Sequence, residues 1–313
     1  MSPGGRRDGA GGRHRVRARR HVRVPLVDLR EWIAETSHGT VHQGDVWSLS
    51  LRDIRLGGPD RVQEVLRAAR DGRHVVVNAT DYADLDIVAA GLLGAQEDGA
   101  RVVVRSGPSM VKSIAGVPDR GPLEPGEIRS SVGAGGGGLI VVGSHVGLSN
   151  RQLRAATARA DVATVELAVS ELVDGDVPTV VRRTSARVRE RLSEGHVLLQ
   201  TSRTVRRGTD AAASLAIARE VSTALSETVA SVRDLPAWVI AKGGITSHDV
   251  AVRGMGIRRA VVLGQLLPGA VSVLVPIEVQ QGSGRVPFVV FAGNVGDEQT
   301  LAHAIDVPSA TTL

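Results

Sequence analysis

Short runs of valine, isoleucine and leucine alternate along the chain with segments whose apolar residues recur every three to four positions. Such runs are typical of buried strands, and the longer recurrence is typical of amphipathic helices. In the first part of the chain the pattern predicts helices and strands in turn, with a tight turn at Asp71-Gly72. The expected elements are a short helix around Trp32, a strand at 46–51, a helix opening at Pro59, a strand at 74–78, a helix at about 84–96 and a strand at 101–105.

The later part of the chain continues this pattern. Because its strands show no alternation of apolar and polar residues, both faces of each strand are expected to be covered, as in parallel sheets under helices. The sequence therefore predicts an α/β protein with two α/β domains and mainly parallel sheets flanked by helices. The expected elements are strands at 139–142, 162–167, 197–200 and 238–241, helices from about Ser149, at 185–192, from Asp210 to about Val232 and through Val250, and β-rich stretches near Val261, Val273 and Val289.

Two stretches without hydrophobic periodicity divide the chain. Residues 1–23 are rich in glycine and arginine and are expected to form a disordered tail. Residues 119–138 contain two prolines and a glycine run around Ala134, which is typical of an interdomain linker. The two domains would then span residues 24–118 and 139–313, a division that suits a chain of 313 residues.

Composition excludes several classes of protein. Apolar residues make up 42% of the chain and charged residues 23%, the proportions of a globular protein with a core, although aromatic residues make up only 2%. The absence of cysteine excludes disulfides, thiolate nucleophiles and cysteine metal sites. Apolar runs are far shorter than the ~20 residues of a membrane-spanning helix, and no secretion signal is visible, so a cytoplasmic location is expected.

Positive charge is concentrated at the N-terminal end. The formal net charge of +5 and the pI of about 10.7 favour a nucleic-acid partner. Residues 1–23 hold eight arginines and one aspartate, however, so the rest of the chain is close to neutral with 30 basic and 32 acidic residues. That tail also has no aromatic residue to stack on bases. Nucleic-acid binding is therefore disfavoured.

Three predicted strands of the second domain end in glycine-containing turns, at the edge where α/β sheets bind ligands. Glycine lets main-chain N–H groups approach an anion, and the N-terminus of a following helix, which Thr246 or Ser247 would cap, adds positive potential. For each of them an ordinary tight turn is the alternative. In the turn at residues 293–296, Asn294 would then take a left-handed conformation. The three turns are Gly143-Ser144-His145, Lys242-Gly243-Gly244-Ile245-Thr246-Ser247 and Gly293-Asn294-Val295-Gly296.

Lys242 is one of only two lysines among 38 basic residues. A compact ammonium group suits a phosphate site, and a solvated surface lysine is the alternative. The Gly-Lys-[Ser/Thr] order of a Walker A motif is absent, and the glycines around Ser144 do not match a serine-hydrolase elbow. His145 is then expected to be a polar wall residue and His248 to face solvent.

In the first domain Arg105 follows a predicted strand. An arginine can bind a carboxylate through two parallel hydrogen bonds, which makes Arg105 a candidate for binding an acidic substrate. A surface arginine at a strand end is the alternative.

A set of short strings in this chain shares its order and spacing with one known family. The strings are Leu139 to His145, Arg151-Gln152-Leu153, Thr201-Ser202-Arg203, Ser214 to Ile217, Ala241 to Ser247, Leu263-Gly264-Gln265 and Val289 to Gly296. Together they resemble the four-carbon acid sugar kinase family. The resemblance implies a C-terminal domain that binds ATP with Mg²⁺, and an N-terminal domain that binds a sugar acid such as a tetronate, whose terminal hydroxyl is phosphorylated. It further implies that Ser144, the turn from Gly243 to Thr246 and Gly293 line the nucleotide site.

The chain also departs from that family. It lacks an Asp-Asp-x-Thr-Gly motif, which the resemblance assigns to sugar-acid binding and catalysis, so the first domain is expected to be incomplete and no catalytic residue is assigned. Asn78 stands where the family has an aspartate, and Ala292 where it has a proline. Exposed strand edges would then favour poor solubility, a homo-oligomer or a partner that supplies the missing half. Two functions remain: an ATP-dependent kinase of four-carbon acid sugars, and a nucleotide-binding fragment impaired in catalysis.

Overall fold

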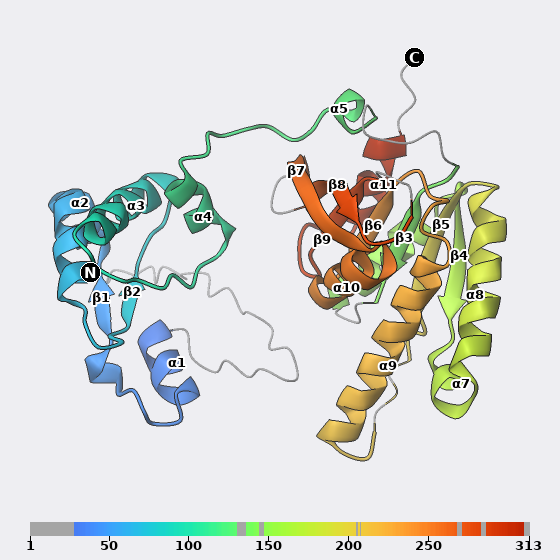
Figure 1. Ribbon diagram of the computed structural model, residues 1–313, viewed down its shortest axis with the longest axis horizontal. Helices are drawn as coiled ribbons and strands as arrows, with labels where there is room; N and C mark the ends of the chain where they lie inside the picture. Colours follow the sequence, from blue (N-terminus) through green and yellow to red (C-terminus); the bar gives the residue numbers. More distant parts are fainter. Residues whose placement is uncertain are drawn as a thin grey trace, which may run out of the picture. The chain divides into compact units, whose positions relative to one another are not determined.

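The computed structural model describes residues 28–129, 136–143, 147–204, 206, 208–267, 271–282 and 286–309. The chain divides into two compact units, Met1–Asp119 and Arg120–Leu313 (Figure 1). The predicted tail at residues 1–23 lies outside the described residues, as do residues 130–135 of the predicted linker.

The first unit packs helices on a two-stranded parallel sheet. β1 (Trp47–Leu49) pairs with β2 (Val75–Val77), and α2 (Leu51–Ala68) and α3 (Tyr82–Glu97) cover the pair. Ser50 and Asp53 form a capping box that starts α2 directly after β1. The unit also contains α1 (Leu29–Thr36), a 3₁₀ turn (Gln43–Asp45) and α4 (Pro108–Ala115).

Helix α2 is divided at Gly58, whose φ of 63° is non-helical. The helix resumes at Pro59, where the sequence predicted its start. On α3, a Cβ at Gly91 would lie 2.6 Å from the carbonyl oxygen of Pro59, so the lack of a side chain lets the two helices approach closely. The core between them is built from Leu49, Ile54, Val62, Leu66, Val88, Ala89, Leu92, Ala95 and Met110.

The prediction of a strand at residues 101–105 is wrong. Within residues 28–129 the only ladder joins β1 to β2, and residues 101–107 pair with neither strand. Without a strand partner the main-chain groups of this segment are left to water. Val103 is 97% exposed, so the apolar run does not mark a buried strand here.

The second unit is built on a seven-stranded sheet in the order β4-β5-β3-β6-β9-β8-β7. The strands from β4 to β9 in this order are parallel, and β8 is antiparallel to both of its neighbours. The predicted α/β fold with a mostly parallel sheet is therefore confirmed. The strands are β3 (Leu139–Val142), β4 (Val162–Leu167), β5 (His196–Thr201), β6 (Val239–Lys242), β7 (Ile257–Leu267), β8 (Val271–Val279) and β9 (Phe288–Phe291).

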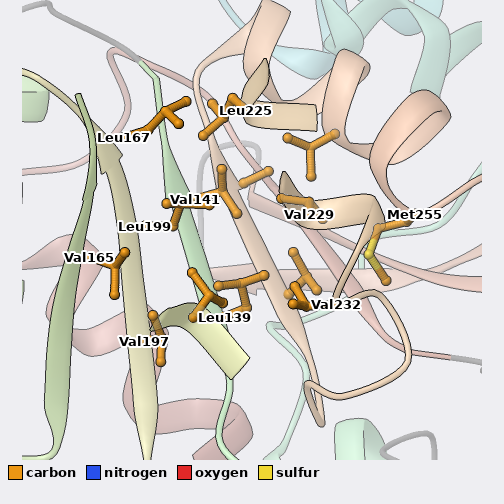
Figure 2. Packing of buried hydrophobic residues seen from close by; sticks show 14 of the residues in the cluster. Leu139, Val141, Val165, Leu167, Val197, Leu199, Leu225, Val229, Val232 and Met255 are labelled. Carbon is orange, nitrogen blue, oxygen red and sulfur yellow. The ribbon is translucent and has the colours of Figure 1, made fainter. Parts of the chain in front are cut away.

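Helices cover both faces of this sheet. Alternate residues of each strand point to opposite faces and so join two different cores. Leu139 and Val141 of β3 join the core formed with α8 and α9, which Figure 2 shows around Leu225 and Val229. Ile140 and Val142 join the core formed with α5, α6 and α11. The helices are α5 (Pro125–Arg129), α6 (Gly147–Thr157), α7 (Val169–Asp174), α8 (Val177–Leu192), α9 (Ala211–Ala230), α10 (Gly244–Asp249) with its π-helical continuation η2 (Val250–Gly254), and α11 (Thr300–Ser309).

Residues 120–129, within the segment predicted as a linker, belong to the second unit. The Leu123 N–H donates to the carbonyl oxygen of Gln265 (2.8 Å), and Arg120 Nη1 donates to that of Leu263 (2.7 Å). These bonds lay the segment along the outer strand β7, and the Leu123 side chain is buried in the core.

Candidate functional site

The turn after β6 combines a main-chain bend with the start of a helix. Gly243 has φ 112° and ψ 141°, a conformation that glycine adopts without strain. Its N–H donates to the carbonyl oxygen of Phe291 (2.8 Å), which ties the turn to β9. Because α10 begins directly at Gly244, Thr246 and Ser247 lie inside the helix, and the prediction that either hydroxyl caps it is wrong. The Ser247 hydroxyl donates instead to a main-chain carbonyl of β6 (2.6 Å).

Lys242 is fully buried at the carboxyl end of β6. Its Nζ donates to the carbonyl oxygen of Ala292 (3.1 Å) and lies 4.1 Å from the centre of the Phe291 ring. Burial disfavours the charged form and lowers the pKa of Lys242 to about 8. The alternative of a solvated surface lysine is therefore wrong, since the ammonium is held inside the second unit beside the turn after β9.

The turn after β9 is held by two buried polar side chains of α6. Ser149 Oγ donates to the carbonyl oxygen of Gly293 (3.1 Å). Gln152 Nε2 donates to the carbonyl oxygens of Val295 (3.0 Å) and Asp297 (2.6 Å). The start of α6, which follows β3, is thus fastened to the turn after β9.

Gly296, and not Asn294, takes the left-handed conformation in this turn. Its φ is 76°, and a Cβ at this position would overlap the side chain of Thr300. Asn294 has no positive φ, so the alternative of a left-handed asparagine is wrong. Both Asn294 and Gly296 are exposed.

The turn after β3 lies against the turn after β6. A Cβ on Gly143 would lie only 2.6 Å from Thr246 Oγ1, so the two turns meet at a distance that a side chain at Gly143 would prevent. Ser144 and His145, which were predicted on this turn, lie outside the described residues. His248 is exposed, and the prediction that it faces solvent is confirmed.

The chain that follows β3 packs on one face of the sheet, and the chain that follows its neighbours β5 and β6 packs on the opposite face. Helix α6 packs on the face that carries Ile140 and Val142, whereas α9 and η2, which come after β5 and β6, pack on the face that carries Val141. In open α/β sheets ligands bind where such connections diverge. The structure brings Lys242 and the turns after β3, β6 and β9 together at this edge, with Ile245 76% exposed beside them. Contact of these residues with a nucleotide stays a prediction.

Arg203 is a further residue at this edge, to which the sequence analysis assigned no role. It follows β5, and its Nη2 donates to Asn150 Oδ1 on α6. Partial burial lowers the pKa of Arg203, and the nearby Glu166 carboxylate opposes this shift. An arginine after a strand carries no signal by itself. Only the pairing of β5 with β3 places it beside the start of α6.

In the first unit the carboxyl ends of β1 and β2 carry a network of polar side chains. Arg55 donates to both carboxylate oxygens of Asp84 (2.7 and 3.0 Å), and Thr80 donates to the same carboxylate through its N–H (2.9 Å) and its hydroxyl (3.0 Å). Chiefly because of the Arg55 hydrogen bond, the pKa of the buried Asp84 is held well below its usual range. The Asn78 amide donates to Ser48 Oγ (2.9 Å) and to a carbonyl at the end of β1 (2.8 Å).

Arg105 lies outside this network. Its guanidinium carbon lies 4.7 Å from the centre of the Trp32 ring, a cation–π distance, and the residue is exposed. Because the strand at 101–105 is absent, Arg105 does not stand at a strand end. Its contact with an acidic substrate stays a prediction.

A resident metal centre would need several ligands close together. Among the residues that the structure describes, no three His, Cys, Asp or Glu side chains gather in this way. In nucleotide sites Mg²⁺ is held largely by phosphate oxygens and water, with one or two carboxylates. A Mg²⁺ ion that arrives with a nucleotide would therefore not require such a cluster.

Comparison with known protein families identifies both parts of the chain. Residues 139–301 match the model of a nucleotide-binding C-terminal domain, and residues 14–114 match that of a sugar-binding N-terminal domain. The fold and these two matches define a protein that joins a sugar-binding domain to a nucleotide-binding domain. Because the two domains are those of one family, the chain belongs to the four-carbon acid sugar kinase family. The resemblance inferred from short strings is confirmed.

Three solved structures align with this chain at low sequence identity. A Salmonella typhimurium LT2 protein, provisionally described as a tRNA synthase, aligns with 17% identity and a TM-score of 0.57 over 83% of this chain and 59% of its own. Haemophilus influenzae protein HI1011 aligns with 20% identity and a TM-score of 0.48 over 83% of this chain and 60% of its own. A Bordetella bronchiseptica protein, solved as a domain-swapped dimer with bound citrate, aligns with 19% identity and a TM-score of 0.47 over 87% of this chain and 61% of its own.

The chain thus spans 59 to 61% of the length of these solved proteins. Among curated proteins, no sequence matches it. In the described parts of the chain, no helix has both the length and the apolar composition needed to cross a membrane.

Proposed function

We propose that this protein is an ATP-dependent kinase that transfers the γ-phosphoryl group of ATP to a hydroxyl of a four-carbon sugar acid in the cytoplasm. Membership of the family supports a sugar-binding and a nucleotide-binding domain. One observation carries the finer proposal: three glycine-containing turns, after β3, β6 and β9, meet beside the buried Lys242 at the carboxyl edge of the nucleotide-binding domain.

Main-chain groups of these turns would hold the phosphates. The first N–H groups of α10, which begins at Gly244 after the bend at Gly243, would donate to an anion, because the first turn of a helix leaves such groups without acceptors inside the helix. The Lys242 ammonium, held on the Ala292 carbonyl, would add positive charge beside the phosphates. Ile245 presents an exposed apolar side chain that would cover one face of the adenine ring.

The transfer itself depends mainly on position and charge. The acceptor oxygen bonds to the γ-phosphorus, the bond to the bridging oxygen of the leaving ADP breaks, and the hydroxyl proton passes to solvent. Mg²⁺, when bound with the nucleotide, neutralises charge on the transferred group. In the first unit Arg105 would bind the carboxylate of the sugar acid through paired hydrogen bonds.

The position of Asn78 favours a second candidate, a nucleotide-binding protein impaired in catalysis. The resemblance places an aspartate there, whereas the Asn78 amide offers no carboxylate and is bonded to Ser48 and to the end of β1. A proton acceptor at this place would then be missing.

Calorimetry with ATP and Mg²⁺, followed by an ADP-release assay over a panel of tetronates, separates these functions. ADP release that depends on one of the acids is expected for the kinase. ATP binding without such release would support the impaired protein, and a rise in turnover in Asn78→Asp would identify the cause. A chain that gives no heat of binding with ATP would refute both candidates.

A further inference from the structure

Three carbonyl groups of the turn after β9 point inward, where α6 supplies their hydrogen-bond donors. They belong to residues 293, 295 and 297, and they accept from Ser149 Oγ (3.1 Å) and from Gln152 Nε2 (3.0 and 2.6 Å). Both donor residues are fully buried. The buried Lys242 donates to the preceding carbonyl, that of residue 292, so a fourth carbonyl of this segment also accepts from a buried side chain.

The inward carbonyls determine where the N–H groups of the turn point. In a trans peptide the C=O and N–H groups point in opposite directions, and the described residues contain no cis peptide. The N–H groups of Asn294, Gly296 and Glu298 therefore face away from α6, toward the surface. All three residues are exposed, and within the described part of the chain their N–H groups make no hydrogen bond.

Two neighbouring N–H groups are already occupied. That of Asp297 donates to Thr300 Oγ1 (2.8 Å), and that of Gln299 donates to the Asp297 carboxylate (2.9 Å). The N–H groups of Asn294, Gly296 and Glu298 are left for another acceptor. Gly296, with its φ of 76°, bends the chain between the outward groups, and left-handed residues form such bends where main-chain amides surround an anion.

We propose that Ser149 and Gln152 are positioning residues for phosphate binding: they turn the N–H groups of Asn294, Gly296 and Glu298 outward as donors to phosphate oxygens. The inference rests on the proposed nucleotide function. It adds which main-chain groups of the turn contact the phosphates and which side chains orient them. Neither Ser149 nor Gln152 touches the nucleotide in this arrangement.

Acidic side chains near these donors are engaged by other groups, which limits their repulsion of a phosphate. The Glu298 carboxylate pairs with Arg151 Nε (2.6 Å) on α6. The Asp297 carboxylate accepts from the Thr300 hydroxyl (2.7 Å), and hydrogen bonds within the turn hold its pKa below the usual range, so it stays a charged acceptor of these internal bonds.

The test compares Gln152→Met and Ser149→Ala with a matched control, Ser185→Ala. Ser185 is also a buried serine whose hydroxyl donates to a main-chain carbonyl, that of Val181 (2.8 Å), but it lies within α8. The affinity of each full-length variant is measured for ATP, tripolyphosphate and adenosine, together with its melting temperature. We expect Gln152→Met to weaken ATP and tripolyphosphate roughly tenfold and Ser149→Ala to weaken them less, because fewer carbonyls are released. Adenosine binding should not change.

Ser185→Ala is expected to lower the melting temperature and to leave all three affinities unchanged. If Gln152→Met does not fold, Ser149→Ala decides the question, because it removes a single hydroxyl. In the unmodified protein, ATP should also slow amide hydrogen exchange in the peptide that covers residues 292–300.

Different outcomes separate the inference from the function on which it rests. If the unmodified protein binds ATP but the variants bind ATP and tripolyphosphate equally well, or ATP does not protect residues 292–300, the positioning role is wrong and the nucleotide function stands. If the unmodified protein binds neither ATP nor tripolyphosphate, the nucleotide function is wrong and the positioning role falls with it.

Discussion

Lys242 Nζ lies 3.1 Å from the carbonyl oxygen of Ala292, a residue 50 positions later in the sequence. The contact joins the last residue of β6 to the first residue after β9. Within the described part of the chain Lys242 forms no ion pair, although it is fully buried. Because an unpaired buried charge is costly, its presence at the edge where open α/β sheets bind ligands favours a functional role.

Lys242→Met tests that role. The change keeps the apolar stem and removes the ammonium, so we expect ATP affinity to fall roughly tenfold, or about 1.4 kcal/mol. Loss of the bond to the Ala292 carbonyl and relief of the buried charge act in opposite directions on stability, so the melting temperature should change little. Lys112→Met, which removes the other lysine of the chain, is the control. Equal ATP affinity in Lys242→Met and the unmodified protein would contradict the proposal.

The lowered pKa of Lys242 predicts a pH dependence of binding. Its pKa is about 8, so the ammonium is lost as the pH rises through this value. We expect ATP affinity to decrease between pH 7 and 9, because a neutral amine no longer attracts phosphate. Calorimetry over this range checks the expectation, and the decrease should be absent in Lys242→Met. A decrease of the same size in that variant would assign the effect to another group.

Gly296→Ala should destabilise the turn after β9. An alanine would have to take a φ of 76° and would overlap Thr300, at a cost of about 1–3 kcal/mol. Gly126→Ala is the control, since Gly126 lies in α5 with open space around its Cα and no left-handed φ, where alanine is favoured. Urea unfolding measures both. A Gly296→Ala protein as stable as the control would show that the turn has another conformation.

The burial of His196 leads us to expect that the protein is less stable in mild acid than at neutral pH. Its Nδ1 accepts the Gly138 N–H (2.8 Å), its Nε2 lies 3.1 Å from Ser309 Oγ, and burial lowers its pKa below 6.5. The carboxylate of Asp161, 4.0 Å from Nε2, opposes this shift only in part. At His196 the folded state therefore binds fewer protons than the unfolded state. The contribution of His196 to the free energy of unfolding is fully present above about pH 6.5 and decreases as the pH falls.

Urea unfolding between pH 7.5 and about 5 tests this prediction, with His196→Gln as the comparison. The variant should be less stable at neutral pH, because it alters the contact with Gly138, and its stability should depend less steeply on pH. An NMR titration that gives His196 a pKa above 6.5 would be incompatible with the proposed environment.

Exposed apolar side chains of the first unit predict association. Val103 is 97% exposed, Leu56 76% and Val111 60%, and exposed apolar side chains favour contact with another protein where they gather. We expect light scattering to show oligomers or aggregates, and the double variant Val103→Ser, Val111→Ser to shift the distribution toward the monomer. A monodisperse monomer of the unmodified protein at high concentration would contradict this expectation.

The sheet of the second unit could be predicted because its strands are apolar runs. The four residues of β3, Leu139–Val142, are all buried, and such runs are typical of strands covered on both faces. The first and last residues of the helices were harder to predict from the sequence. Helix α8 begins at Val177, well before the expected start at Ser185, because Asp176 caps it and a proline occupies its first turn. At residues 101–105 an apolar run misled the prediction, since a strand needs a partner that the sequence alone does not show.

The sequence predicted the individual turns of the candidate site but not the contacts between them. Glycine turns after apolar runs indicated Gly243 and Gly293, because strand ends are visible in the sequence. The burial of Lys242 and the bonds of Ser149 and Gln152 to the turn after β9 depend on which strands are neighbours. That order inserts β9 between β6 and β8, and no local pattern encodes it.

Among the described strands β9 comes last in the sequence, yet it lies inside the sheet, next to β6. A nascent chain that is still short of Phe288 would have β3 and β6 but no turn for Ser149 and Gln152 to hold. The proposed phosphate site would then lack one of its three turns. A nucleotide bound at the proposed site would therefore stabilise chains that include β9 in preference to chains that end before it.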